Sequence, residues 1–74
     1  MKVYTVRDKV ADEYAPPYLA RTDGAAARAF VEITNGQKIS YVSDLELYRI
    51  GDFDISTGVL TGCVPVLVDT AKEV

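Results

Sequence analysis

Only one segment of this 74-residue chain has the pattern of an α-helix, and strand-like segments lie on both sides of it. Either Thr22 or Asp23 can cap its start, because each side-chain oxygen can accept a hydrogen bond from a free amide of the first turn. The alanines that follow favour a helix, and Asn35-Gly36 predicts its end. We therefore expect a helix over about residues 23–34. Its buried stripe is predicted to be Ala26, Ala29, Phe30 and Ile33.

The remaining segments alternate like strands or contain turn residues. Strands are predicted at residues 2–8, 18–21, 45–53 and 59–64. The Pro16-Pro17 pair lies in a loop or at an edge, and residues 37–44 form a connection. Residues 54–58 predict a hairpin turn that ends in Gly58, which suits a left-handed position. Pro65 either ends the last strand or marks an edge, and residues 66–68 can add a short extension.

This order predicts a two-layer α+β domain with the order β-β-α-β-β. A mainly antiparallel sheet of about four strands carries one helix on one face. The chain is a single domain over residues 1–74, with an ordered core over about 2–68 and a tail over 69–74. One helix covers only one sheet face, so the other face is expected to bind a partner.

The chain has one cysteine and no histidine, which removes most stabilising cross-links and most catalytic sets. An intrachain disulfide is impossible, and most zinc sites and histidine-dependent nucleophiles are excluded. We expect no enzyme activity, no metal and no cofactor. Asp52 and Asp54 are assigned to the hairpin turn, and Cys63 to a buried, inert thiol. A short chain without such links is expected to form a homodimer or a larger homo-oligomer.

The net charge of −3 and the isoelectric point of about 4.7 argue against a protein that coats duplex DNA through bulk positive charge. No segment is long and apolar enough to suggest a membrane span, and residues 1–5 do not resemble a signal peptide. The expected location is a reducing cytoplasm.

Tyrosine and arginine side chains are concentrated in the first 28 residues. Residues 1–37 contain five basic and five acidic residues, whereas residues 38–74 contain three and six. A sheet that displays tyrosine beside arginine can stack single-stranded bases and neutralise phosphates. The candidate nucleic-acid-binding residues are Tyr4, Arg7, Tyr18, Arg21 and Arg28, with the tyrosines as stacking platforms and the arginines as phosphate contacts. The alternative is that these tyrosines line the core or a dimer seam.

Two blocks of sequence resemble a known viral family. Residues 16–30 (PPYLARTDGAAARAF), followed by residues 47–54 (LYRIGDFD) and Thr57-Gly58, are similar to the small nonstructural protein of gokushoviruses. These are single-stranded DNA phages of the Microviridae, which include the Chlamydia phages. The opening residues 1–8 also resemble that family, and the likeness extends to about residue 68.

The resemblance implies a nonstructural phage protein of the host bacterial cytoplasm, associated with the synthesis and packaging of single-stranded DNA. The family is described as DNA-binding or DNA-synthesis proteins, so binding of single-stranded DNA is the expected function. The alternative is a regulator that binds no DNA. It would instead contact the phage replication initiator or host replication proteins.

Overall fold

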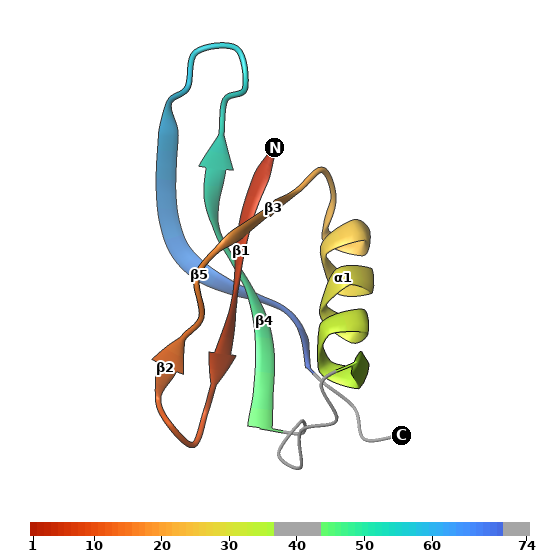
Figure 1. Cartoon of the computed structure of the whole chain (residues 1–74). Coiled ribbons are helices and arrows are strands. Elements are labelled where there is room, and N and C mark those ends of the chain that lie inside the picture. Colours follow the sequence, from red (N-terminus) through yellow and green to blue (C-terminus); the bar gives the residue numbers. More distant parts are fainter. Residues whose placement is uncertain (37–43, 71–74) are drawn as a thin grey trace.

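The computed structural model describes residues 1–36 and 44–70, which form a twisted sheet with one helix packed beside it (Figure 1). The elements are β1 (Lys2–Asp8), β2 (Glu13–Tyr14), β3 (Tyr18–Ala20), α1 (Asp23–Gly36), β4 (Leu45–Phe53) and β5 (Leu60–Thr70). The strands pair in the order β2-β1-β4-β5, β3 also pairs with β1, and all pairs are antiparallel. The predicted α+β class is confirmed.

Two strand predictions need correction. The sheet has five strands rather than about four, because Glu13–Tyr14 pairs with the end of β1 inside a segment predicted to be a loop. The last strand continues to Thr70, beyond the predicted limits of both the strand and the ordered core. Residues 37–43 of the predicted connection and 71–74 of the predicted tail lie outside the described residues.

Pro65 lies within β5, and the position of β5 in the sheet explains why the strand can contain it. β5 pairs only with β4 among the described strands, so it is an edge strand, where a proline removes no bond from an inner ladder. The register steps from Arg49↔Val66 to Gly51↔Gly62, which places residues 63–65 opposite Ile50 as a bulge. Pro65 was predicted either to end the last strand or to mark an edge, and the second alternative is correct.

Thr22 begins the helix. Its Oγ1 accepts a hydrogen bond from the Ala25 amide at 3.1 Å, and its carbonyl accepts one from the Ala26 amide at 3.0 Å. The side-chain bond satisfies one of the amides that a helix start leaves without an internal partner. The predicted cap is therefore confirmed as Thr22.

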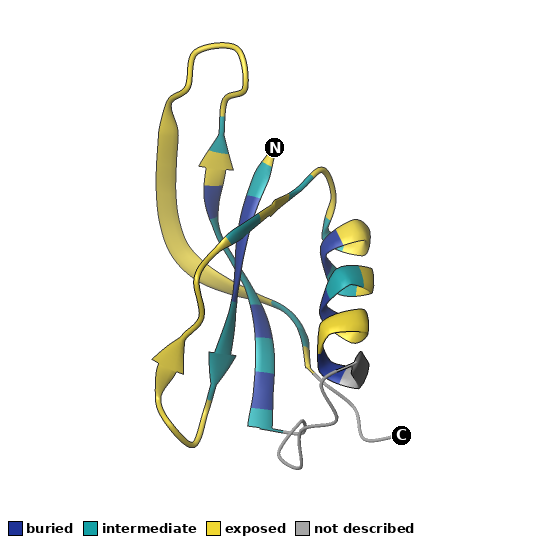
Figure 2. Cartoon of the chain, viewed as in Figure 1, coloured by how far each residue is buried: buried dark blue, intermediate teal, exposed yellow. Residues whose placement is uncertain are grey.

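The core lies between α1 and the sheet face that β1 and β4 turn toward it (Figure 2). Its buried members are Tyr4, Ala26, Phe30, Leu45 and Leu47. The prediction for Ile33 is wrong, because Ile33 is 42% exposed and the neighbouring Thr34 is buried instead. The buried stripe therefore repeats every four residues. Thr34 can be buried because its hydroxyl donates to the Val31 carbonyl at 3.1 Å.

Gly51 allows β4 and β5 to approach each other closely. A Cβ at this position would overlap the Thr61 carbonyl oxygen and lie 3.2 Å from the Gly62 Cα. Both neighbours are backbone atoms, which cannot move aside by changing a rotamer. The glycine is thus required by the strand spacing at this point.

A polar junction joins the start of α1 to the sheet. The Tyr4 hydroxyl donates to Asp23 Oδ1 at 2.5 Å, and Arg49 Nη1 lies 3.3 Å from Asp23 Oδ2. The hydrogen bond from Tyr4, assisted by the charge of Arg49, holds the pKa of Asp23 below its usual value. Burial raises the pKa of Tyr4, and Asp23 raises it further.

This junction makes stability depend on pH. Because the pKa of Asp23 is lower in the folded state, its contribution is complete above its unfolded pKa of about 4 and is lost as the pH falls through the folded pKa. We expect Asp23→Asn to be less stable than wild type at pH 7, and the gap to narrow in acid. Thermal melts of both proteins across this range test the prediction. A gap that stays constant down to pH 2 would show that the Asp23 carboxylate adds no pH-dependent stability.

Candidate interface on the open face of the sheet

α1 is the one helix of the described chain, and it packs against one face of the sheet, so no described helix covers the opposite face. Paired residues of neighbouring strands share a face, so the pairs Val3↔Leu19, Arg7↔Tyr14 and Tyr48↔Leu67 place these side chains together on the side away from the helix. Tyr14, Leu19 and Leu67 are about half exposed, whereas Val3 is buried beneath its neighbours, with 6% of its surface exposed. We call this set, Val3, Arg7, Tyr14, Leu19, Tyr48 and Leu67, the open face.

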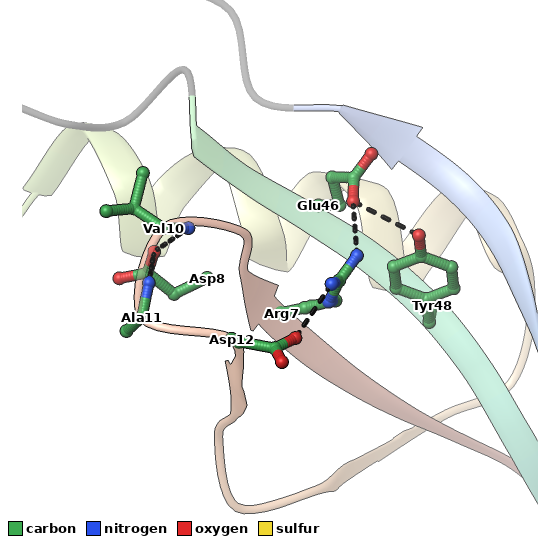
Figure 3. A network of polar contacts seen from close by, with 7 residues as sticks. All are labelled: Arg7, Asp8, Val10, Ala11, Asp12, Glu46 and Tyr48. Carbon is green, nitrogen blue, oxygen red and sulfur yellow. Dashed lines mark hydrogen bonds and ion pairs between the residues drawn. The ribbon is translucent and has the colours of Figure 1, made fainter.

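A compact cluster around Arg7 occupies one end of the open face (Figure 3). Arg7 Nη2 donates to Asp12 Oδ1 at 2.8 Å, and Nη1 lies 3.7 Å from Glu46 Oε1. The guanidinium carbon lies 5.9 Å from the centre of the Tyr14 ring, which meets the Tyr48 ring edge-on with centroids 6.2 Å apart. The Tyr48 hydroxyl donates to the same Glu46 oxygen at 3.1 Å.

The turn that follows β1 positions this cluster. Asp8 Oδ1 accepts hydrogen bonds from the amides of Val10 and Ala11, at 3.0 and 3.1 Å, which tightens the turn (Figure 3). Asp12 then adopts the left-handed region with φ of 54°, a conformation that aspartate tolerates better than most residues. This bend returns the carboxylate of Asp12 to Arg7.

The charge of Arg7 is therefore largely compensated. Its hydrogen bond to Asp12 raises the pKa of the guanidinium, so Arg7 stays protonated, while two carboxylates lie within 4 Å of it. A phosphate would have to compete with both carboxylates for the same donors. Arg7 therefore orders the Tyr14–Tyr48 corner more readily than it recruits an anion.

Of the five predicted site residues, the structure brings Tyr4 and Tyr18 together, but in the core rather than on a surface that could bind nucleic acid. Tyr4 is fully buried under α1, so its ring has no face available for a base. Tyr18 is half-buried on the helix side, where its hydroxyl donates to the Ala26 carbonyl at 3.0 Å and its ring lies 6.0 Å from that of Tyr4. Both rings belong to the core, as the alternative prediction held.

The other two predicted arginines lie elsewhere. Arg21 precedes α1, Arg28 is on its outer surface, and both are exposed. Neither forms an ion pair with another described residue. These two arginines remain available as phosphate contacts, and Arg28, which belongs to α1, is not on the sheet face that carries Arg7.

Tyr14 and Tyr48 were not among the predicted site residues. Tyr48 could have been assigned to this face, because it alternates with the core residue Leu47 along β4. Tyr14 could not, because its position depends on β2, a two-residue strand that pairs with β1 only through the turn after Asp8.

A cavity of about 430 Å³ lies on the helix side, between the 13–18 segment and the end of α1. Its lining includes the carboxylates of Asp8 and Glu13, and no lysine or arginine among the described residues. Such a lining disfavours a phosphate group. The described residues also contain no group of three potential metal ligands, and no described helix has the length and hydropathy to cross a membrane.

β5 is exposed along most of its length (Figure 2). Leu60, Val64, Val66 and Leu67 are each between 45% and 83% exposed. Cys63 is also exposed, which corrects the prediction of a buried thiol. That prediction failed because β5 is an outer strand, whereas the sequence pattern suggested a strand buried on one face.

Comparison with protein families decides the affiliation. The family model described as "Phage ORF5 protein" matches residues 1–74. The chain belongs to this phage family. No curated protein and no solved structure matches it.

Membership in the Phage ORF5 family confirms the prediction of a bacteriophage protein. The narrower assignment to gokushoviruses stays a prediction based on the sequence blocks. In this family member the open face and the β5 edge both expose apolar side chains to a potential partner.

Proposed function

We propose that this phage protein acts by binding rather than by catalysis, and that the open face takes up a protein partner. The resemblance to gokushovirus nonstructural proteins suggests the setting, namely the synthesis and packaging of viral single-stranded DNA in the host cytoplasm. The partner would be the phage replication initiator or a host replication protein.

One observation carries this proposal. The open face exposes Tyr14, Leu19 and Leu67, while its arginine is already paired with Asp12 and Glu46. Aromatic and aliphatic groups around a compensated charge are typical of the core of a protein–protein interface. A nucleic-acid surface would instead need uncompensated positive charge, and the chain as a whole carries −3.

A single substitution at the far margin of the open face tests this proposal. Leu19→Lys places a charge where Leu19 is 44% exposed, and Val31→Lys is its matched control on the outer face of α1, where Val31 is 47% exposed. We expect Leu19→Lys to weaken binding to the purified replication initiator, or to a replication protein captured from infected cells, by at least about tenfold. Val31→Lys should bind like wild type. Equal binding by all three proteins would refute the role of the open face.

Binding of single-stranded DNA is the second candidate, and a different observation favours it. Arg21 and Arg28 are exposed and without an ion-pair partner among the described residues, and Tyr14 presents about half of its surface beside Arg7. These groups supply two phosphate contacts and one stacking ring.

Titration of a labelled single-stranded oligothymidylate between about 50 and 200 mM salt tests the second candidate. If it is correct, Arg21→Ala and Arg28→Ala should each lower the salt slope by about 0.7, because each removes one phosphate contact. Tyr14→Ala should cost about 1–3 kcal/mol of affinity. Arg7→Lys should change the salt slope little, since Arg7 is already paired. If wild type shows no binding even near 50 mM salt, the second candidate is wrong.

A further inference from the structure

The part of β5 before Pro65 is an exposed strand edge without charge. Residues 60–64 are all exposed, and Leu60 and Val64 are 64% and 83% exposed. The stretch from residue 59 to residue 68 contains no charged side chain. One edge of this segment pairs with β4, and no described strand covers the other.

Soluble proteins usually protect such an edge with charged side chains, prolines or bulges. β5 has both a proline and a bulge at residues 63–65, but Pro65 lies beyond residues 60–64, and the bulge changes the pairing with β4 without ending the strand. Beyond the bulge Val68 packs against the core and Asp69 adds a charge, so the second half is less suited to pairing. The first half is left free to accept a strand.

We propose that residues 60–64 of β5 pair antiparallel with the same residues of a second copy of this chain, about a two-fold axis at Gly62. In this register Leu60 lies opposite Val64 of the second copy, and the symmetry repeats that contact. Because the strand carries no charge, two copies can pair without repulsion between like charges. The absence of charge also gives a different protein no charged group to recognise, which favours a second copy as the partner. The two sheets become one continuous sheet.

A stable dimer through this edge has to bury a substantial area of each chain. A specific dimer buries at least about 1,000 Å² in total, or roughly 500 Å² per chain. That is about a tenth of the 4968 Å² surface of one chain. The turn that connects β4 to β5 adds two more exposed apolar side chains just before β5. These are Ile55 and Val59, which are 68% and 57% exposed.

The mass in solution tests the interface. Sedimentation equilibrium of the full chain at micromolar concentration should give twice 8.1 kDa for wild type and for the control Val31→Lys. Val64→Lys should sediment at 8.1 kDa, because it places a charge in the seam. A monomeric wild type, or a Val64→Lys variant that remains dimeric, overturns the proposal. Neither substitution lies on the open face, so a failure here leaves the proposed function untouched.

Disulfide trapping tests the register. With Gly62 on the axis, Thr61 lies opposite Cys63 of the second copy, at the Cα separation of about 4.5–5.5 Å that a disulfide can bridge. Under mild oxidation with diamide, Thr61→Cys should form a covalent dimer. Wild type and the double variant Thr61→Cys/Cys63→Ser should not, because their single cysteines are diagonal neighbours about 7–8 Å apart. A covalent dimer from either of them, or none from Thr61→Cys, overturns this register.

Discussion

Replacing Phe30 by alanine should lower the free energy of unfolding by about 3–5 kcal/mol, the range typical of large aromatic side chains removed from a packed core. Phe30 has no exposed surface and packs with Tyr4 and Leu47 between α1 and the sheet. It is the largest side chain that the helix contributes to the core. A chain of 74 residues has a total stability of roughly 4–11 kcal/mol, so the variant should be at the limit of folding at room temperature.

Chemical denaturation followed by circular dichroism measures this loss. Val31→Ala is the matched control on the same helix, because Val31 is 47% exposed and should lose much less stability. If Phe30→Ala unfolds at the same denaturant concentration as Val31→Ala, the packing of α1 against the sheet is different from the one described.

Gly51→Ala should destabilise the protein by about 3 kcal/mol or more, at the upper end of the range for overpacked sites. The added Cβ meets the Thr61 carbonyl oxygen and the Gly62 Cα, both part of the β5 backbone. β5 can avoid the overlap only by moving away from β4, and it then loses the pairs on either side of Gly51. Glycine has no side chain whose contacts could be lost, so the expected destabilisation comes entirely from the close spacing of the two strands.

Gly24→Ala is the control for Gly51→Ala, because the nearest atom to a Cβ at Gly24 is 3.9 Å away and alanine favours a helix. Thermal melts should show a large loss for Gly51→Ala and none for Gly24→Ala. Amide hydrogen exchange adds a local measure, since the β5 amides of the Gly51 variant should exchange faster than those of β1. Equal melting temperatures for the two variants would mean that β5 does not lie this close to β4.

The elements that depend on local sequence were predicted well. The helix and its Thr22 cap, the long strand over residues 45–53 and the turn before Gly58 each follow from residues within one or two turns of chain. Gly58 has φ of +78°, as a left-handed turn position requires. Tyr4 and Arg7 are three residues apart in β1 and lie on opposite faces of the sheet, as the alternation of side chains along a strand requires.

The elements that depend on distant partners were not predicted. β2 exists because two residues pair with the end of β1, and Pro65 is tolerated because β5 is at the edge of the sheet. Neither the pairing of β2 nor the edge position of β5 can be predicted from the neighbouring residues alone. The tyrosines of the candidate site were chosen wrongly for the same reason. The sequence does not distinguish an exposed tyrosine from a core tyrosine before the position of the helix on the sheet is known. Tyr4 and Tyr18 lie under α1, whereas Tyr14 and Tyr48 lie on the other side.

The central position of β1 sets an order on folding. β1 is synthesised before β4, its longest partner, so Val6 cannot pair with Leu47 until β4 has been made. Until then the nascent chain can form only the short pairs with β2 and β3 and the contacts with α1. Such non-local pairing makes folding slow for a domain of this size, because a long loop must close before the main ladder forms. During that interval the edge of β1 that later pairs with β4 is unpaired, and an unpaired strand edge in an incompletely folded chain is prone to aggregation.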